Sequence, residues 1–182
     1  MTFFFVRSLY CSFTWAFSNP FPWSIIWRSW ALLRVSFFSW ETSWNRILTI
    51  DKLKRRGWNM PNRCYLCKEE EETNDHLILF CKKVTMLWSL LFSLFDVQWI
   101  LHSSIKRNLI GWHGAFVSKR REKAWRASPL WLMWTLCKKR NERVFNDIEW
   151  SNEALKQFFL YTSVNWGRVS LSMIVFIEWL FV

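Results

Sequence analysis

The sequence CYLCKEEEETNDHLILFC, residues 64–81, places three cysteines and one histidine within one short segment. Two residues separate Cys64 from Cys67, eight separate Cys67 from His76, and four separate His76 from Cys81. Two thiolates separated by two residues can approach one ion from a tight turn, and Zn²⁺ favours four sulfur or imidazole ligands in a tetrahedron. The segment therefore predicts a structural zinc site, whose complete ligand shell leaves no position for a catalytic water.

Cysteine is otherwise scarce, because the 182 residues contain only five. Cys11 and Cys137 each stand alone among apolar residues and are predicted to be small buried hydrophobic side chains. The alternative for the cluster is three free thiols and a surface imidazole that lie together by chance, which the scarcity disfavours. An odd count with three clustered cysteines does not match a secreted disulfide framework. We therefore expect an intracellular location, in the nucleus or the cytoplasm.

The segments on either side of the cluster have helical periodicity. Apolar residues recur at steps of three and four over residues 23–44, which predicts one helix with a wide apolar face. Thr49 and Gly57 are typical of the start and the end of a second, short helix. A third helix is predicted from near Cys81 to about Asp96.

The C-terminal half of the chain also has helical signals. A basic, weakly patterned stretch covers residues 118–126. Pro129 is then predicted to open a helix that runs to about residue 145, because proline is favoured in the first turn. Ser151 resembles the N-cap of a last helix that continues through Val164.

Together these signals predict a mainly α fold, in which a small zinc-stabilised loop lies between helices and a helical C-terminal region follows. Residues 1–22 lack a clear period and are predicted to be a poorly ordered leader, followed by a zinc-binding domain over 23–96 and a helical extension over 97–182. The acidic run at residues 69–72 is predicted to be a solvated loop. Neither the apolar start nor the apolar run at 173–182 is expected to be a signal peptide or to span a membrane.

Charge and aromatic content bear on the partners of the chain. The formal net charge is +11, and 20% of the residues are aromatic, including 16 tryptophans. A positive excess favours RNA or DNA through phosphate neutralisation, although it also serves solubility. Exposed aromatic rings would stack on bases or meet a protein partner. The candidate phosphate contacts, which are alternatively a solvated helix face, are Lys52, Lys54, Arg55, Arg56, Lys82 and Lys83.

With these residues in view, the chain resembles the zinc-binding domain found downstream of reverse transcriptase in plant non-LTR retrotransposons. The matching text is RVSFFSWETSWNRILTIDKLKRRGW (residues 34–58), then residues 64–81, then the Leu87 and Trp88 pair. The later WLMWTLCKKRNERVFND (residues 131–147) looks like the tryptophan and RN-R-F helix that commonly follows in these reading frames. Residues 31–33 depart from the family pattern, which usually has a proline before the basic residue of its first helix.

The resemblance implies a structural zinc-binding module derived from a retrotransposon reverse transcriptase and associated with nucleic acid. The sequence has no aspartate pair preceded by an aromatic residue, as reverse transcriptases have, and no acidic set for ribonuclease H. Asp51, Asp75 and Asp96 are isolated and are predicted to be cap or loop residues. We therefore expect neither enzymatic activity nor a small-molecule substrate. The alternatives are a protein-interaction module that once packed on a polymerase, and a relic without a retained function.

Overall fold

The computed structural model describes residues 21–115 and 117–165, and within these ranges the fold is helical and has no strand. The predicted fold class is therefore confirmed, whereas the leader up to residue 20 and the run at 173–182 lie outside the described residues. No described helix combines the length and the apolar character needed to cross a membrane. The elements, in chain order, are α2 (Trp23–Arg28), α3 (Leu33–Ser43), α4 (Ile50–Arg55), the π-helical turn η1 (His76–Phe80), α5 (Lys82–Phe95), α6 (Ile105–Gly111), the 3₁₀ turn η2 (Trp112–Gly114), α7 (Lys119–Asn146) and α8 (Asn152–Asn165).

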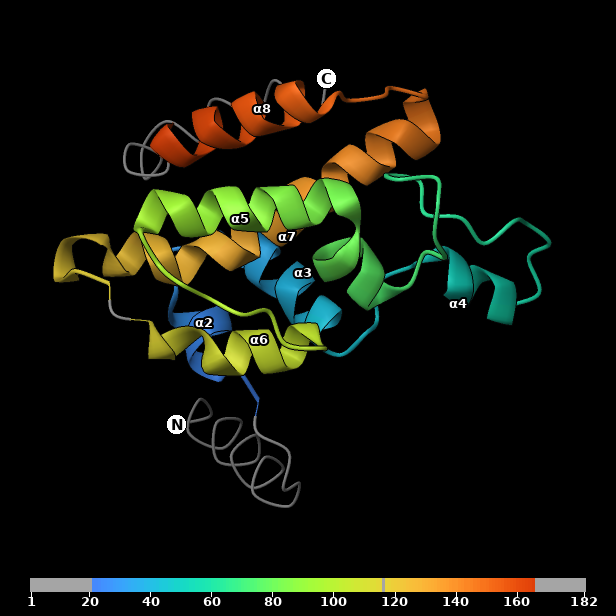
Figure 1. The fold of residues 1–182 in the computed structure, drawn as a ribbon. Coiled ribbons are helices and arrows are strands. Elements are labelled where there is room, and N and C mark those ends of the chain that lie inside the picture. Colours follow the sequence, from blue (N-terminus) through green and yellow to red (C-terminus); the bar gives the residue numbers. More distant parts are fainter. Residues whose placement is uncertain (1–20, 116, 166–182) are drawn as a thin grey trace, which may run out of the picture.

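The long helix α7 packs against four of the other described elements. It contacts α2, α3, α5 and η1, while α8 packs on α5 and α6 packs on α3. Figure 1 shows α7 passing behind α5, with α8 running along the other side of α5 and with α4 set apart from the other helices. The core between these helices is built from buried aliphatic side chains, among them Ile25, Ile26, Val35, Leu77, Ile78, Leu79, Val84, Leu87, Leu91, Leu130, Leu132, Met133 and Leu136.

The prediction of one continuous helix over residues 23–44 is wrong, because the chain breaks between α2 and α3. Ser29 follows α2 and Leu32 precedes α3, and both have extended backbone conformations. The break lets both helices face one core, since Ile26 on α2 and Val35 on α3 are completely buried. In a continuous helix these two side chains would be about two and a half turns apart and would point in opposite directions.

The buried face of α3 carries small hydroxyl residues and not its aromatic ones. Ser39 and Thr42 are fully buried, and their hydroxyls donate to backbone carbonyls of the preceding turn at 2.8 and 2.7 Å. Small side chains allow a closer approach of neighbouring helices, here of α7. Leu33 and Phe37 point outward and are 66% and 50% exposed. The predicted wide apolar face is therefore partly on the surface.

The predicted ends of the shorter helices are confirmed. Thr49 precedes α4 in an extended conformation, and Gly57, with φ +91°, lies beyond its end. Cys81 precedes α5, which ends at Asp96 in the left-handed conformation. Ser151 accepts a hydrogen bond at 3.1 Å from the backbone N–H three residues later, at the start of α8. These signals are local, which explains why the sequence alone predicted them.

Pro129 lies inside α7 and does not open a helix, so that prediction is wrong. Proline lacks the N–H that would bond to the Trp125 carbonyl. This carbonyl instead accepts hydrogen bonds from Trp112 Nε1 at 2.9 Å and from Ser128 Oγ at 2.7 Å. In return Trp125 Nε1 donates to the Trp112 carbonyl at 3.1 Å, and the two indoles stack with centroids 4.4 Å apart. Because tertiary contacts replace the missing bond, the helix continues through the proline.

We predict that Trp112→Phe lowers the free energy of unfolding by about 2 kcal/mol, because it removes the indole donor and part of a buried ring. Urea unfolding followed by far-UV circular dichroism measures this. Trp58→Phe is the control, since Trp58 is 61% exposed and has no such bond in the described structure. An equal loss in the two variants would contradict the role assigned to Trp112.

Candidate metal centre

The structure brings the four predicted ligands together. The ligand atoms of Cys64, Cys67, His76 and Cys81 all lie within 4.8 Å of one another, and Cys67 Sγ lies 3.4 Å from His76 Nε2. In a tetrahedral zinc site with bonds of about 2.3 Å to sulfur and about 2.0 Å to nitrogen, the sulfur-to-nitrogen separation is about 3.5 Å. The cluster therefore has the donor set and the dimensions of a four-ligand metal site.

A tight turn presents the first two cysteines. The Lys68 N–H donates to the Cys64 carbonyl at 2.7 Å, and Lys68 has a left-handed backbone with φ 62°. The Cys64 N–H donates to the carbonyl of Glu70 at 2.7 Å, so the chain folds back directly after the second cysteine. This geometry places both thiols beside the histidine that follows.

The π-helical turn η1 joins the other two ligands. The Cys81 N–H donates to the His76 carbonyl at 2.8 Å, a bond that spans five residues and accounts for the four residues between these ligands. Thr73 Oγ1 accepts from the His76 N–H at 3.2 Å at the start of the turn. Trp88 Nε1 donates to the Ile78 carbonyl at 2.8 Å and so attaches the turn to α5.

The orientation of the imidazole suits metal binding. His76 Nε2 faces the thiols, while Nδ1 lies 3.3 Å from the carboxylate of Glu70. A carboxylate at the second ring nitrogen commonly fixes the orientation and tautomer of a metal-binding histidine. Glu70 belongs to the same loop as the ligands, so the segment supplies its own outer partner.

Protons are shared within the cluster. A hydrogen bond with Cys64 raises the pKa of His76 to about 9, and a hydrogen bond with Cys81 raises the pKa of Cys64 to about 12. The same bond with Cys64 lowers the pKa of Cys81, whose thiol also meets the backbone N–H of Lys83. Metal ligands bind in their deprotonated forms, so a metal ion would take the place of these shared protons.

Glu72 corrects the prediction of a solvated loop over residues 69–72. Its side chain is completely buried and accepts hydrogen bonds from the backbone N–H groups of Ile50 at 3.3 Å and Tyr65 at 3.1 Å. It also pairs with Arg140 of α7, whose Nη2 lies 2.6 Å from Oε1. Buried carboxylates require such partners. The other three glutamates of the run are exposed, as predicted.

Two further polar residues of the same loop attach it to other helices. Asn74 Nδ2 donates to the carbonyl of Thr42 on α3 at 3.0 Å. Asp75 Oδ1 accepts from the backbone N–H of Ile105, the first residue of α6, at 3.2 Å. Together with Glu72, these residues connect the segment between the ligands to α3, α6 and α7. The sequence alone does not reveal these connections, because the partners are distant in the chain.

Four of the six cations predicted to contact phosphate form hydrogen bonds or ion pairs within the protein. Lys52 and Lys83 donate to backbone carbonyls. Arg55 and Lys82 pair with carboxylates. Lys54 and Arg56 are exposed on α4 and at its end, and neither has an ion pair within the described part of the chain. Phosphate binding by these six residues stays a prediction.

Comparison with known proteins agrees with the geometry. Residues 4–88 match the model of a family described as zinc-binding in reverse transcriptase. The match contains all four clustered ligands and confirms the resemblance for this region. No curated protein and no solved structure matches the chain. The predicted domain boundaries, which place a zinc-binding domain at residues 23–96, stay a prediction.

We predict that Glu72→Gln lowers the free energy of unfolding by about 3 kcal/mol, because it leaves the buried Arg140 guanidinium without a counter-charge. Glu71→Gln makes the same change at an adjacent exposed residue and is expected to cost less than about 0.5 kcal/mol. Denaturant unfolding of both variants in excess zinc provides the measurement. Equal stability of the two variants would show that the Glu72 pair does not hold the loop.

Proposed function

We propose that this chain is a structural zinc-binding module, derived from a plant retrotransposon reverse transcriptase, that associates with nucleic acid and has no polymerase activity of its own. The observation that carries the proposal is the set of three thiols and one imidazole within 4.8 Å. All four positions of a tetrahedral ion are then taken by protein, so the role is to fix structure and not to activate water.

The surroundings of the cluster support a structural role. The loop between the second and third ligands is attached to three helices through Glu72, Asn74 and Asp75. An ion that holds this loop would therefore stabilise the arrangement of α3, α6 and α7 as well as the loop itself. Structural zinc contributes directly to folding in this way.

We predict one zinc ion per chain, measured by mass spectrometry of the purified protein. Cys67→Ser is expected to lose the ion, whereas Cys137→Ser on α7 is expected to keep it. Zinc at a thousandfold excess over its Kd is expected to stabilise the parent by about 4 kcal/mol and to leave the stability of Cys67→Ser unchanged. Full zinc content in Cys67→Ser, or equal loss in both variants, would rule out this ligand set.

Nucleic-acid association rests on the net charge of +11 and on cations that remain exposed, such as Lys54 and Arg56. We predict binding of the zinc-loaded chain to a short single-stranded RNA, measured by fluorescence anisotropy. The affinity is expected to fall about tenfold or more between about 50 and 200 mM salt, because phosphate contacts release counterions. Binding that is absent or insensitive to salt would contradict this part of the proposal.

A protein-interaction module is the second candidate, and the exposed apolar face of α2 and α3 favours it. Trp23, Leu33, Phe37 and Trp44 are each at least 43% exposed. Exposed apolar clusters of this kind are typical of interfaces. Light scattering after size exclusion is the test. A monomer at all concentrations, with no change on Leu33→Glu with Phe37→Glu, would count against self-association through this face.

A further inference from the structure

The first turns of α7 carry four exposed cations, Lys119, Arg120, Arg121 and Lys123. Residues 119–126 contain five cationic side chains and one carboxylate, Glu122, which pairs with Arg126 at 3.4 Å. Arg120 and Arg121 are exposed, and neither side chain has an ion pair or hydrogen bond within the described residues. Unlike Lys52 and Lys83, these guanidinium groups hold no other group among the described residues and are open to an outside anion.

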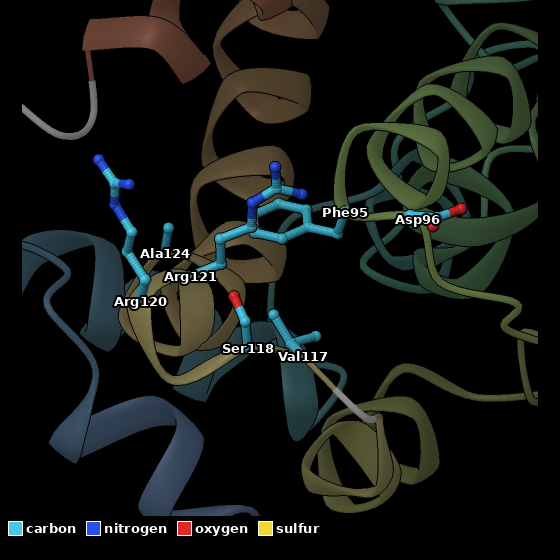
Figure 2. A pocket seen from close by; sticks show the side chains of 7 residues that line it. All are labelled: Phe95, Asp96, Val117, Ser118, Arg120, Arg121 and Ala124. Atoms are coloured by element: carbon cyan, nitrogen blue, oxygen red, sulfur yellow. The ribbon is translucent and has the colours of Figure 1, made fainter.

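A hollow lies beside these arginines, and we call it the α7 hollow. It has a volume of about 850 Å³. Figure 2 shows its side chains between the end of α5 and the start of α7. Asp96 provides the one carboxylate of its lining, against two guanidinium groups. The lining residues are Phe95, Asp96, Val117, Ser118, Arg120, Arg121 and Ala124.

An exposed indole adjoins the same helical turns. Trp30, in the break between α2 and α3, is 66% exposed, and Lys123 Nζ of α7 lies 4.2 Å from its ring centre. This contact places a flat aromatic surface beside Lys123, which lies within one helical turn of the unpaired arginines. Nucleic-acid-binding proteins that hold single strands combine these two features, cations for the backbone and aromatic rings for unpaired bases.

We propose that single-stranded nucleic acid binds across the first turns of α7, with Arg120 and Arg121 at its phosphates and a base stacked on Trp30. This inference rests on the proposed nucleic-acid association and assigns it a surface. Charge complementarity selects an anionic partner, and the exposed indole selects one with unpaired bases over an acidic peptide. The surface differs from the cations of the α4 region and of the start of α5 that the sequence suggested.

The α4 region provides a matched control, because it also has two exposed cations without an ion pair in the described residues and an exposed indole. These are Lys54, Arg56 and Trp58. The α7 surface adds the hollow and two more lysines, Lys119 and Lys123. The experiment compares zinc-loaded parent and variants for binding to a short single-stranded RNA by fluorescence anisotropy over a range of salt. Zinc content and far-UV circular dichroism verify that each variant is folded.

Arg120→Gln with Arg121→Gln is expected to weaken binding about tenfold and to reduce the salt slope by about 1.4, the value for two single-strand phosphate contacts. Trp30→Ala is expected to weaken binding at least about fivefold through lost stacking. Lys54→Gln with Arg56→Gln removes the same charge and is expected to change the Kd less than about twofold, as is Trp58→Ala.

The outcomes separate this inference from the proposed function. If the parent binds RNA but the α4 variants lose as much affinity as the α7 variants or more, the assigned surface is wrong and the association stands. If the parent shows no salt-dependent binding, the association fails and the surface fails with it. If polyglutamate binds as tightly as the RNA and Trp30→Ala has no effect, an acidic protein partner replaces the nucleic acid.

Discussion

The buried pair of Glu72 and Arg140 constrains the rest of the structure. A carboxylate with no exposed surface is stable only when its charge and lone pairs are satisfied, here by a guanidinium and two backbone N–H groups. Arg140 lies 68 residues further along the chain, and Arg143, one turn later, donates to the Leu66 carbonyl at 2.9 Å. The ligand loop and α7 must therefore be ordered together. The structural unit of the metal loop extends beyond residue 88, where the family match ends.

The cluster of three cysteines and one histidine is linked to the rest of the fold through the residues between its members. The cysteine turn and the π-helical turn set the positions of the four donor atoms, and Glu70 fixes the orientation of the His76 imidazole. The intervening Glu72, Asn74 and Asp75 reach α7, α3 and α6. A bound ion would reduce the conformational freedom of this short loop, and each of the three contacts would then form at a lower entropic cost. Metal binding at the cluster would thus be coupled to long-range helix packing.

Features that depend on nearby residues were predictable from the sequence, and features that depend on distant partners were not. The ligand spacing and the ends of α4 and α5 follow from residues within a few positions of one another. The break before α3 arises because α2 and α3 share one core, which periodicity alone does not reveal. Pro129 remains helical because Trp112 bonds the carbonyl that the proline leaves free. Glu72 looked solvated because its neighbours are acidic, while its partner is on α7.

Composition overstates what the surface offers to a partner. The net charge includes Arg140 and Arg143, which are buried and hold the ligand loop. It is therefore a poor measure of the cations that phosphate can reach. The tryptophans divide in the same way. Trp112 and Trp125 fill the core and support α7, whereas Trp30 stands in an exposed break of the chain. A partner contacts only side chains that are neither buried nor paired within the fold. For this reason the break before α3 and the start of α7 matter more to recognition than the total charge.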